Sequence, residues 1–132
     1  MIEHLHGLPV QREHTSFRLT DDELSATTNN EYFTMINHIT KTSFLLKDSR
    51  LSRVKTFLDE RMKNYIENVV ELDDKFVMTQ SWSTLTKRGE SHHIHNHSNT
   101  IFSLVFYVSS EGEKSGNFVF DFQPSRLRER WD

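Results

Sequence analysis

Ile101-Phe-Ser-Leu-Val-Phe-Tyr-Val108 is an apolar run that predicts a β-strand, and it follows a dense group of histidines, Glu90-Ser-His-His-Ile-His-Asn-His97. Both faces of the run are apolar, as expected for a strand that is buried on two sides. Because alternate residues of a strand share a face, Ser103, Val105 and Tyr107 would line the interior beside the histidines. The chain is therefore expected to carry a histidine site at the mouth of a buried strand.

The histidine segment predicts a metal site. Imidazole is the commonest protein ligand of transition metals. In an extended chain His93, His95 and His97 would point to one side. Two histidines at i and i+2 can bind one ion, whereas a third at i+4 is too distant unless the chain bends, because each residue advances a strand by about 3.3 Å. His95 and His97 are the predicted ligands, and the pair of His93 and His95 is the alternative.

Other candidate residues have simpler interpretations. Glu90 could supply a carboxylate, but a solvated glutamate beside a turn is the simpler interpretation. Trp82 and Tyr107 could border a pocket, and core packing is simpler for both. The remaining histidines are expected to be isolated, at the surface or partly buried: His4, His6, His14 and His38. The chain contains no Gly-x-Ser-x-Gly, no His-Glu-x-x-His and no phosphate-binding glycine pattern.

Composition excludes several classes of function. The 132 residues suit one domain, 1–132, and the absence of cysteine leaves nitrogen and oxygen as the metal ligands. A net charge of −3 without a long basic block gives no support for nucleic-acid binding. No stretch approaches the roughly 20 apolar residues of a membrane helix, and Met1-Ile-Glu-His4 does not begin a signal peptide. A soluble cytoplasmic protein is expected.

The first half of the chain is predicted to carry the helices. Thr20-Asp-Asp-Glu23 has the pattern of a capping box and predicts a short helix from Asp21 to about Thr27. A long amphipathic helix is predicted to begin at Ser49 or Ser52 and to end near Val70. Two further predictions concern the flanking segments, an edge strand at Leu8-Pro9-Val10 and mostly loop at 28–49.

The second half is predicted to form strands. After Asp74 the apolar period changes to two, which predicts a strand from Phe76 to Leu85 that ends at the turn Lys87-Arg-Gly89. The alternating run Phe118–Phe122, closed by Pro124, predicts the last strand. Helices followed by strands favour an α+β or helix-supported β architecture.

Four motifs in this half of the chain are more specific than its pattern of strands. They are Thr79-Gln-Ser-Trp82, Lys87-Arg-Gly-Glu-Ser-His-His93, His95-Asn-His-Ser-Asn99 and Phe102-Ser-Leu-Val-Phe-Tyr107. Together they resemble a family of 2-oxoglutarate- and Fe(II)-dependent oxygenases that is common in bacteria and in phages of marine bacteria. The resemblance extends over about residues 44–122 and is most specific at 79–107.

The resemblance implies a double-stranded β-helix, or jelly roll, with helical support at about 20–72 and roll strands at about 75–123. It implies Fe(II) held by His95 and His97, 2-oxoglutarate as cosubstrate, and substrate hydroxylation coupled to oxidative decarboxylation of 2-oxoglutarate to succinate. A phage-encoded member would work in the host cytoplasm.

This chain departs from the family pattern. Relatives use a distal histidine and a basic cosubstrate anchor, but no histidine follows His97, and Arg126, Arg128 and Arg130 lie outside the expected strand context. Ser98, Thr100 and Leu104 replace the family's proline, serine and glycine. The chain ends at Asp132, about where the second half of the roll should begin, so a C-terminally truncated oxygenase with weak metal binding and little turnover is expected.

Two further expectations follow from a truncated roll. Half a jelly roll would expose sheet edges, which favours a homodimer. The alternative function is a non-catalytic metal-binding or structural remnant domain of a phage protein. A cupin-like enzyme ranks lower because the segment after His97 lacks the glutamate that cupins place there.

Overall fold

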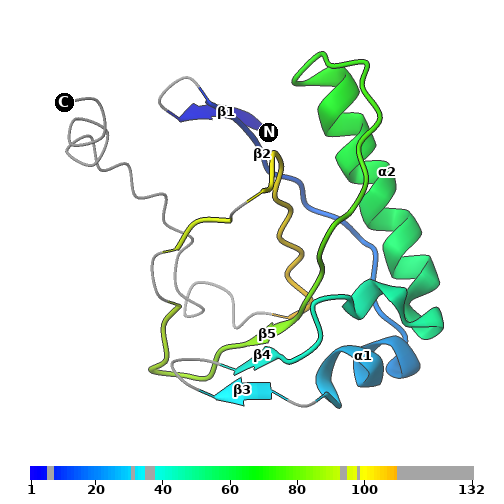
Figure 1. Ribbon diagram of the computed structural model, residues 1–132, viewed down its shortest axis with the longest axis vertical. Coiled ribbons are helices and arrows are strands. Elements are labelled where there is room, and N and C mark those ends of the chain that lie inside the picture. The colour runs from blue at the N-terminus through cyan, green and yellow to red at the C-terminus, as the bar shows by residue number, and fades with distance from the viewer. Residues whose placement is uncertain (6–7, 31, 35–37, 93–94, 98, 110–132) are drawn as a thin grey trace.

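The computed structural model describes residues 1–5, 8–30, 32–34, 38–92, 95–97 and 99–109, and it has a mixed α+β fold (Figure 1). The elements are β1 (Ile2–Leu5), β2 (Leu8–Gln11), α1 (Asp21–Thr28), β3 (Tyr32–Thr34), β4 (His38–Thr40), the 3-10 turns η1 (Leu45–Lys47) and η2 (Ser49–Leu51), α2 (Ser52–Asn68) and β5 (Thr84–Leu85). The predicted α+β class is confirmed. The described strands form one two-stranded and one three-stranded sheet, and not the strands of a double-stranded β-helix.

Helix α1 begins where the sequence predicted. The Thr20 amide donates to Glu23 Oε2 at 2.8 Å, and the Glu23 amide donates to Thr20 Oγ1 at 3.3 Å, which completes the capping box. Asp21 and Asp22 place negative charge in the first turn, where the helix dipole favours it. The local sequence therefore specifies the start of this helix.

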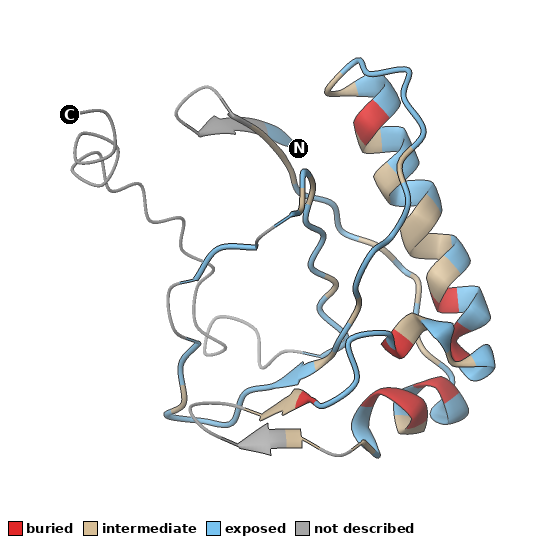
Figure 2. Ribbon diagram, viewed as in Figure 1, coloured by how far each residue is buried: buried red, intermediate tan, exposed pale blue. Residues whose placement is uncertain are grey.

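Helix α2 also confirms its prediction, and its first turns form the core. The 3-10 turn η2 precedes it, so the α-helix itself begins at Ser52. The core lies where α1, η1, η2 and α2 meet (Figures 1 and 2). Its buried members are Ala26, Leu45, Leu51 and Val54, with Phe17, Leu19, Leu46 and Leu58 packed against them.

The two sheets are small and antiparallel. β1 and β2 form a hairpin that includes the predicted edge strand, and Pro9 lies opposite His4 in it. The hairpin is tied to α2, because the Tyr65 hydroxyl donates to the Pro9 carbonyl at 2.6 Å. In the other sheet β4 is central and pairs with β3 and β5.

The prediction of mostly loop at residues 28–49 was wrong for β3, β4 and η1. Each strand has three residues, too few for an alternation of apolar and polar side chains to be recognised. β3 pairs with the nearby β4, and β4 also pairs with β5, which lies more than 40 residues further along the chain. Local sequence therefore carried little signal for this sheet.

The strand predicted from Phe76 to Leu85 is only partly present. Strand β5 covers its last two residues, and Ser81 forms an isolated parallel bridge with Phe44. Residues 71–80 contain no strand. The period of two predicts an extended chain. In the described residues, however, most of this segment has no neighbouring strand with which to pair.

The strand predicted at 101–108 was wrong as well, because the described residues of this segment contain none. Phe102 contacts the rings of Tyr65 and Phe76, and Phe106 contacts those of Phe17 and Phe57. Ser103, Val105 and Tyr107, predicted to line an interior, are exposed. One face of the run packs towards α2 and the other faces solvent.

The predicted strand at 118–122 lies outside the described residues. No helix in the described part of the chain is long and apolar enough to cross a membrane.

Candidate metal centre

A hydrogen-bonded turn precedes the histidines. The Lys87 amide donates to Glu90 Oε2 at 2.7 Å, and the Glu90 amide donates to the Lys87 carbonyl at 3.0 Å. Gly89 has a φ of +85°, a conformation that favours glycine. The predicted turn is therefore present, and Glu90 belongs to it as a half-buried member that closes it from its C-terminal end.

His95 and His97 lie side by side beyond this turn. Both are exposed, and their ring centroids are 4.9 Å apart with planes inclined at 62°. Two imidazoles bound to one divalent ion through nitrogen–metal bonds of about 2.1 Å place their centroids roughly 4.5 to 5.2 Å apart, for ligand angles of about 90° to 110°. The ring spacing fits a two-histidine metal site. His93, the alternative ligand, lies outside the described residues.

His92 joins this pair although the sequence did not predict it. Its ring centroid lies 4.6 Å from that of His95, with planes inclined at 31°. The prediction assumed a strand, which would have turned His92 to the opposite face from His95. Residues 91–92 and 95–97 are not in a strand, so that assumption fails. The only sequence signal that could have placed His92 beside His95 was the high density of histidines in this segment.

Trp82 extends the group to a row of four rings. Its indole stacks on the His97 imidazole, with centroids 5.3 Å apart and planes inclined at 18°. We call Trp82, His97, His95 and His92 the ring row. The core packing that the sequence favoured for Trp82 and Tyr107 was wrong, because the two residues are 36% and 64% exposed. Trp82 borders the histidines instead.

The chemical state of His97 suits metal binding. Partial loss of hydration lowers the pKa of its imidazole, and the nearby charge of protonated His95 lowers that pKa further. The residue is exposed, and the indole of Trp82 stacks on one face of its ring. A lowered pKa favours the neutral imidazole, whose lone pair binds metals.

No group of three or more histidine, aspartate or glutamate side chains is positioned to hold a metal ion in the described part of the chain. Glu90 Oε2 lies 3.7 Å from His38 Nδ1, and His38 packs edge-on against Tyr32. His14 is exposed. His6 and the side chain of His4 lie outside the described part. The ring pair of His95 and His97 has the two ligands that the sequence predicts, and their role in binding a metal stays a prediction.

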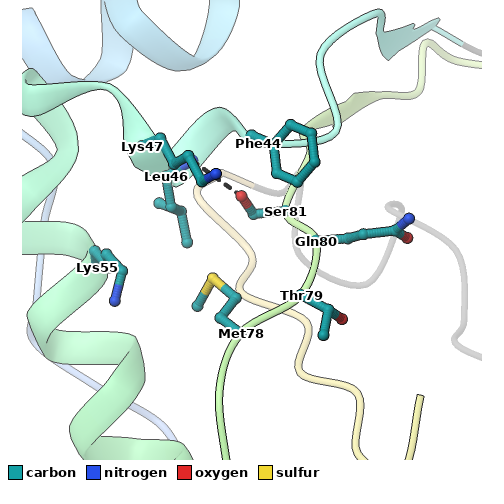
Figure 3. Close-up of a pocket in the computed structure, with 8 residues that line it drawn as sticks. All are labelled: Phe44, Leu46, Lys47, Lys55, Met78, Thr79, Gln80 and Ser81. Carbon is teal, nitrogen blue, oxygen red and sulfur yellow. Dashed lines mark hydrogen bonds between the residues drawn. The ribbon is translucent and has the colours of Figure 1, made fainter. Parts of the chain in front are cut away.

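The described pockets lie elsewhere. One of about 60 Å³ lies between η1, α2 and residues 78–81, and Figure 3 shows Lys47, Lys55 and Met78 around it. The Leu46 amide donates to Ser81 Oγ at 3.0 Å across its wall. A larger pocket, of about 340 Å³, is lined by Met1, Arg12, Glu13 and His14. Neither contains a predicted metal ligand.

Comparison with protein-family models, curated proteins and solved structures finds no match to this chain. A function for this chain is therefore inferred from the chemistry of its own residues.

Proposed function

We propose that this chain is a 2-oxoglutarate- and Fe(II)-dependent oxygenase domain in which His95 and His97 are two of the iron ligands. The observation that supports this most is the ring spacing of 4.9 Å between them. The proposal includes the fold that the resemblance implies, a partial jelly roll at about 75–123, of which the described residues contain only the strand β5. The motifs that carry the resemblance imply the same two histidines as iron ligands.

The ligand chemistry fits Fe(II) in part. Imidazole nitrogen is a ligand that iron accepts, and oxygenases of this kind bind it through two histidines and one carboxylate, leaving positions open for cosubstrate and oxygen. His95 and His97 would hold the metal, and iron when bound would supply the activation of oxygen. We assign no third ligand and no basic anchor for 2-oxoglutarate, so the proposal predicts weak metal binding and low turnover.

The alternative is a non-catalytic metal-binding domain. The exposure of both histidines favours it, because an open pair can bind a metal without a site that excludes water. This alternative predicts metal binding without consumption of 2-oxoglutarate.

The test is an anaerobic titration of the full chain with Fe(II), followed by addition of 2-oxoglutarate and oxygen and detection of succinate. We expect His95→Ala and His97→Ala each to weaken Fe(II) binding at least about tenfold, as loss of one of two ligands should. His14→Ala, at an exposed histidine outside the ring row, is the matched control and should bind like the wild type.

The outcomes separate the two functions. Succinate formed by the wild type and not by either ligand variant supports the oxygenase. Metal binding without succinate supports the non-catalytic domain. Equal Fe(II) affinity of the wild type and both ligand variants would refute the site itself.

A further inference from the structure

We infer that Trp82 is a positioning residue that holds the His97 ring in the orientation in which it faces His95. The inference rests on the proposed function, because it concerns the same pair of metal ligands. It extends that function by assigning a role to a residue that does not itself bind the metal.

The contact between the two rings is specific in its geometry. The planes of the indole and the imidazole are inclined at only 18°, with centroids 5.3 Å apart, which is a stacked arrangement. An exposed histidine otherwise samples several side-chain orientations within nanoseconds. Stacking on a large flat ring restricts this rotation and holds the His97 ring at its observed spacing and inclination to His95, while the ring edge that carries the metal-binding nitrogens is left uncovered by the stack.

Trp82 can do this because the chain on both sides of it is firmly held. On one side the Ser81 amide donates to the Ser43 carbonyl at 2.8 Å, and the Ser81 carbonyl accepts from the Leu45 amide at 2.9 Å. The Ser81 hydroxyl also accepts from the Leu46 amide at 3.0 Å, the bond drawn in Figure 3. The residue before Trp82 is therefore fixed to the segment that contains η1.

The residue after Trp82 is held as well. The Ser83 carbonyl accepts from the Thr40 amide at 3.0 Å, and the Ser83 amide donates to Thr40 Oγ1 at 3.1 Å. Ser83 Oγ donates to the Thr27 carbonyl of α1 at 2.8 Å. Trp82 thus projects from a backbone anchored to β4, η1 and α1.

The histidine segment lacks comparable support from secondary structure. Residues 95–97 belong to neither a helix nor a strand, and the His97 ring meets the anchored part of the fold through the indole. A metal site is more effective when its ligands are oriented before the metal arrives, and neighbouring side chains often provide that orientation. In this chain the indole of Trp82, whose backbone is anchored, is the neighbouring side chain that can orient His97.

A first experiment tests the positioning without any metal. In the wild-type protein the indole ring current should move the NMR signals of the His97 ring protons upfield. We expect Trp82→Leu to move these signals downfield and Trp82→Phe to retain part of the upfield shift. Tyr107→Leu, at another exposed aromatic residue, is the control and should leave them in place. His97 signals that do not respond to Trp82→Leu would overturn the inference.

A second experiment tests the consequence for the metal, with Co²⁺ alone as the probe. We expect Trp82→Leu to weaken Co²⁺ binding about tenfold, the lower end of the effect of groups that orient a ligand. Trp82→Phe should restore most of the affinity, and Tyr107→Leu should bind like the wild type. Equal affinity of Trp82→Leu and Tyr107→Leu would overturn the positioning role.

The two experiments also separate this inference from the proposed function. A wild-type chain that binds no Co²⁺ refutes the proposed metal site, while the ring-current measurement still decides the contact between Trp82 and His97. Circular dichroism of each variant checks that helix content is retained. If Trp82→Leu fails this check, the ring-current measurement on Trp82→Phe decides the inference, because an upfield shift as large as that of the wild type would count against it.

Discussion

Glu23 is the clearest case in this molecule of a single residue whose charge supports the fold. Its carboxylate is buried, with 4% of the residue exposed, at the junction of α1 and α2. Arg53 Nε donates to Glu23 Oε1 at 2.8 Å, and Arg53 Nη2 donates to the Arg18 carbonyl at 2.7 Å. The guanidinium of Arg53 also lies over the Phe17 ring. One charge pair therefore connects the two helices and the segment before α1.

This environment makes the stability of the protein sensitive to acid. The hydrogen bond from Arg53, followed by that from the Thr20 amide, lowers the pKa of Glu23 from 4.5 to about 2. A group whose pKa is lower in the folded state stabilises the fold fully above its unfolded pKa. That contribution is lost as the pH falls from about 4.5 towards 2.

We predict that Glu23→Gln lowers the free energy of unfolding by about 1 to 2 kcal/mol at neutral pH, since a buried hydrogen bond to a charged group is lost while Arg53 remains half exposed. The difference from the wild type should shrink as the pH falls through the window from 4.5 to 2. Urea unfolding at a series of pH values measures both. Asp59→Asn, at a more exposed ion pair with Lys55, is the control and should change stability by less than about 0.5 kcal/mol. A constant difference between Glu23→Gln and the wild type over this pH range would contradict the prediction.

For contacts between individual residues, the sequence predicted those between near neighbours in the chain and missed those between distant residues. The bond between Thr20 and Glu23 was predictable because a capping box has a fixed spacing of three residues. The bond from Glu23 to Arg53 spans 30 residues, and no sequence pattern indicates it. The stack of Trp82 on His97 was missed for the same reason.

At the scale of elements, the same distinction separates helices from strands. The long apolar stripe of α2 predicted a helix of nearly the observed extent, because each of its turns repeats the signal. Strands β3 and β4 have three residues each, too few for a clear pattern, and β4 also pairs with the distant β5. The run at 101–108 has the composition of a strand, but it pairs with no strand in the described part of the chain.

The segment at 101–108 nevertheless has a defined inner face. Phe106 contacts the rings of Phe17 and Phe57, at centroid distances of 6.1 and 5.9 Å. Phe17 and Phe57 are themselves stacked, 4.1 Å apart. Val105 next to Phe106 is 57% exposed. The segment is therefore held by Phe106 against Phe17 and the α2 residue Phe57.

We predict that Phe106→Ala lowers the free energy of unfolding by about 2 to 4 kcal/mol, towards the lower range for loss of a packed aromatic ring because Phe106 is only half buried. Val105→Ala should cost less than about 0.5 kcal/mol, as expected for an exposed side chain. Chemical unfolding of both variants gives the comparison. Similar costs for the two changes would mean that the segment is not packed by this face.

At the scale of the whole molecule, two extended segments expose large apolar side chains to solvent among uncharged polar ones. Residues 76–86 and 101–109 contain no charged side chain. Several of their large apolar residues are exposed, among them Val77 and Ile101 at 74% and 78%. The two segments come together where Phe76 meets Phe102, and Figure 2 shows the exposed stretches of both. Monomeric proteins rarely leave so extended an apolar surface uncovered.

We propose that a second copy of the chain covers this surface. Proteins keep exposed extended segments apart by placing lysine or another charge on them, and these two segments carry none. Identical uncharged segments can pair without repulsion, whereas a charged partner would gain no ion pair with them. The dimer expected from the sequence would use these two segments as its contact.

We predict that the full chain self-associates and that its weight-average sedimentation coefficient rises with concentration. Val105→Lys, which puts a charge at the centre of the exposed face, should weaken association at least about tenfold, because pairing would bury that charge. Ser16→Lys adds the same charge at an exposed position outside the face and should associate like the wild type. A wild-type chain that sediments as a monomer at every concentration would refute the predicted self-association, and association unaffected by Val105→Lys would place the dimer contact elsewhere.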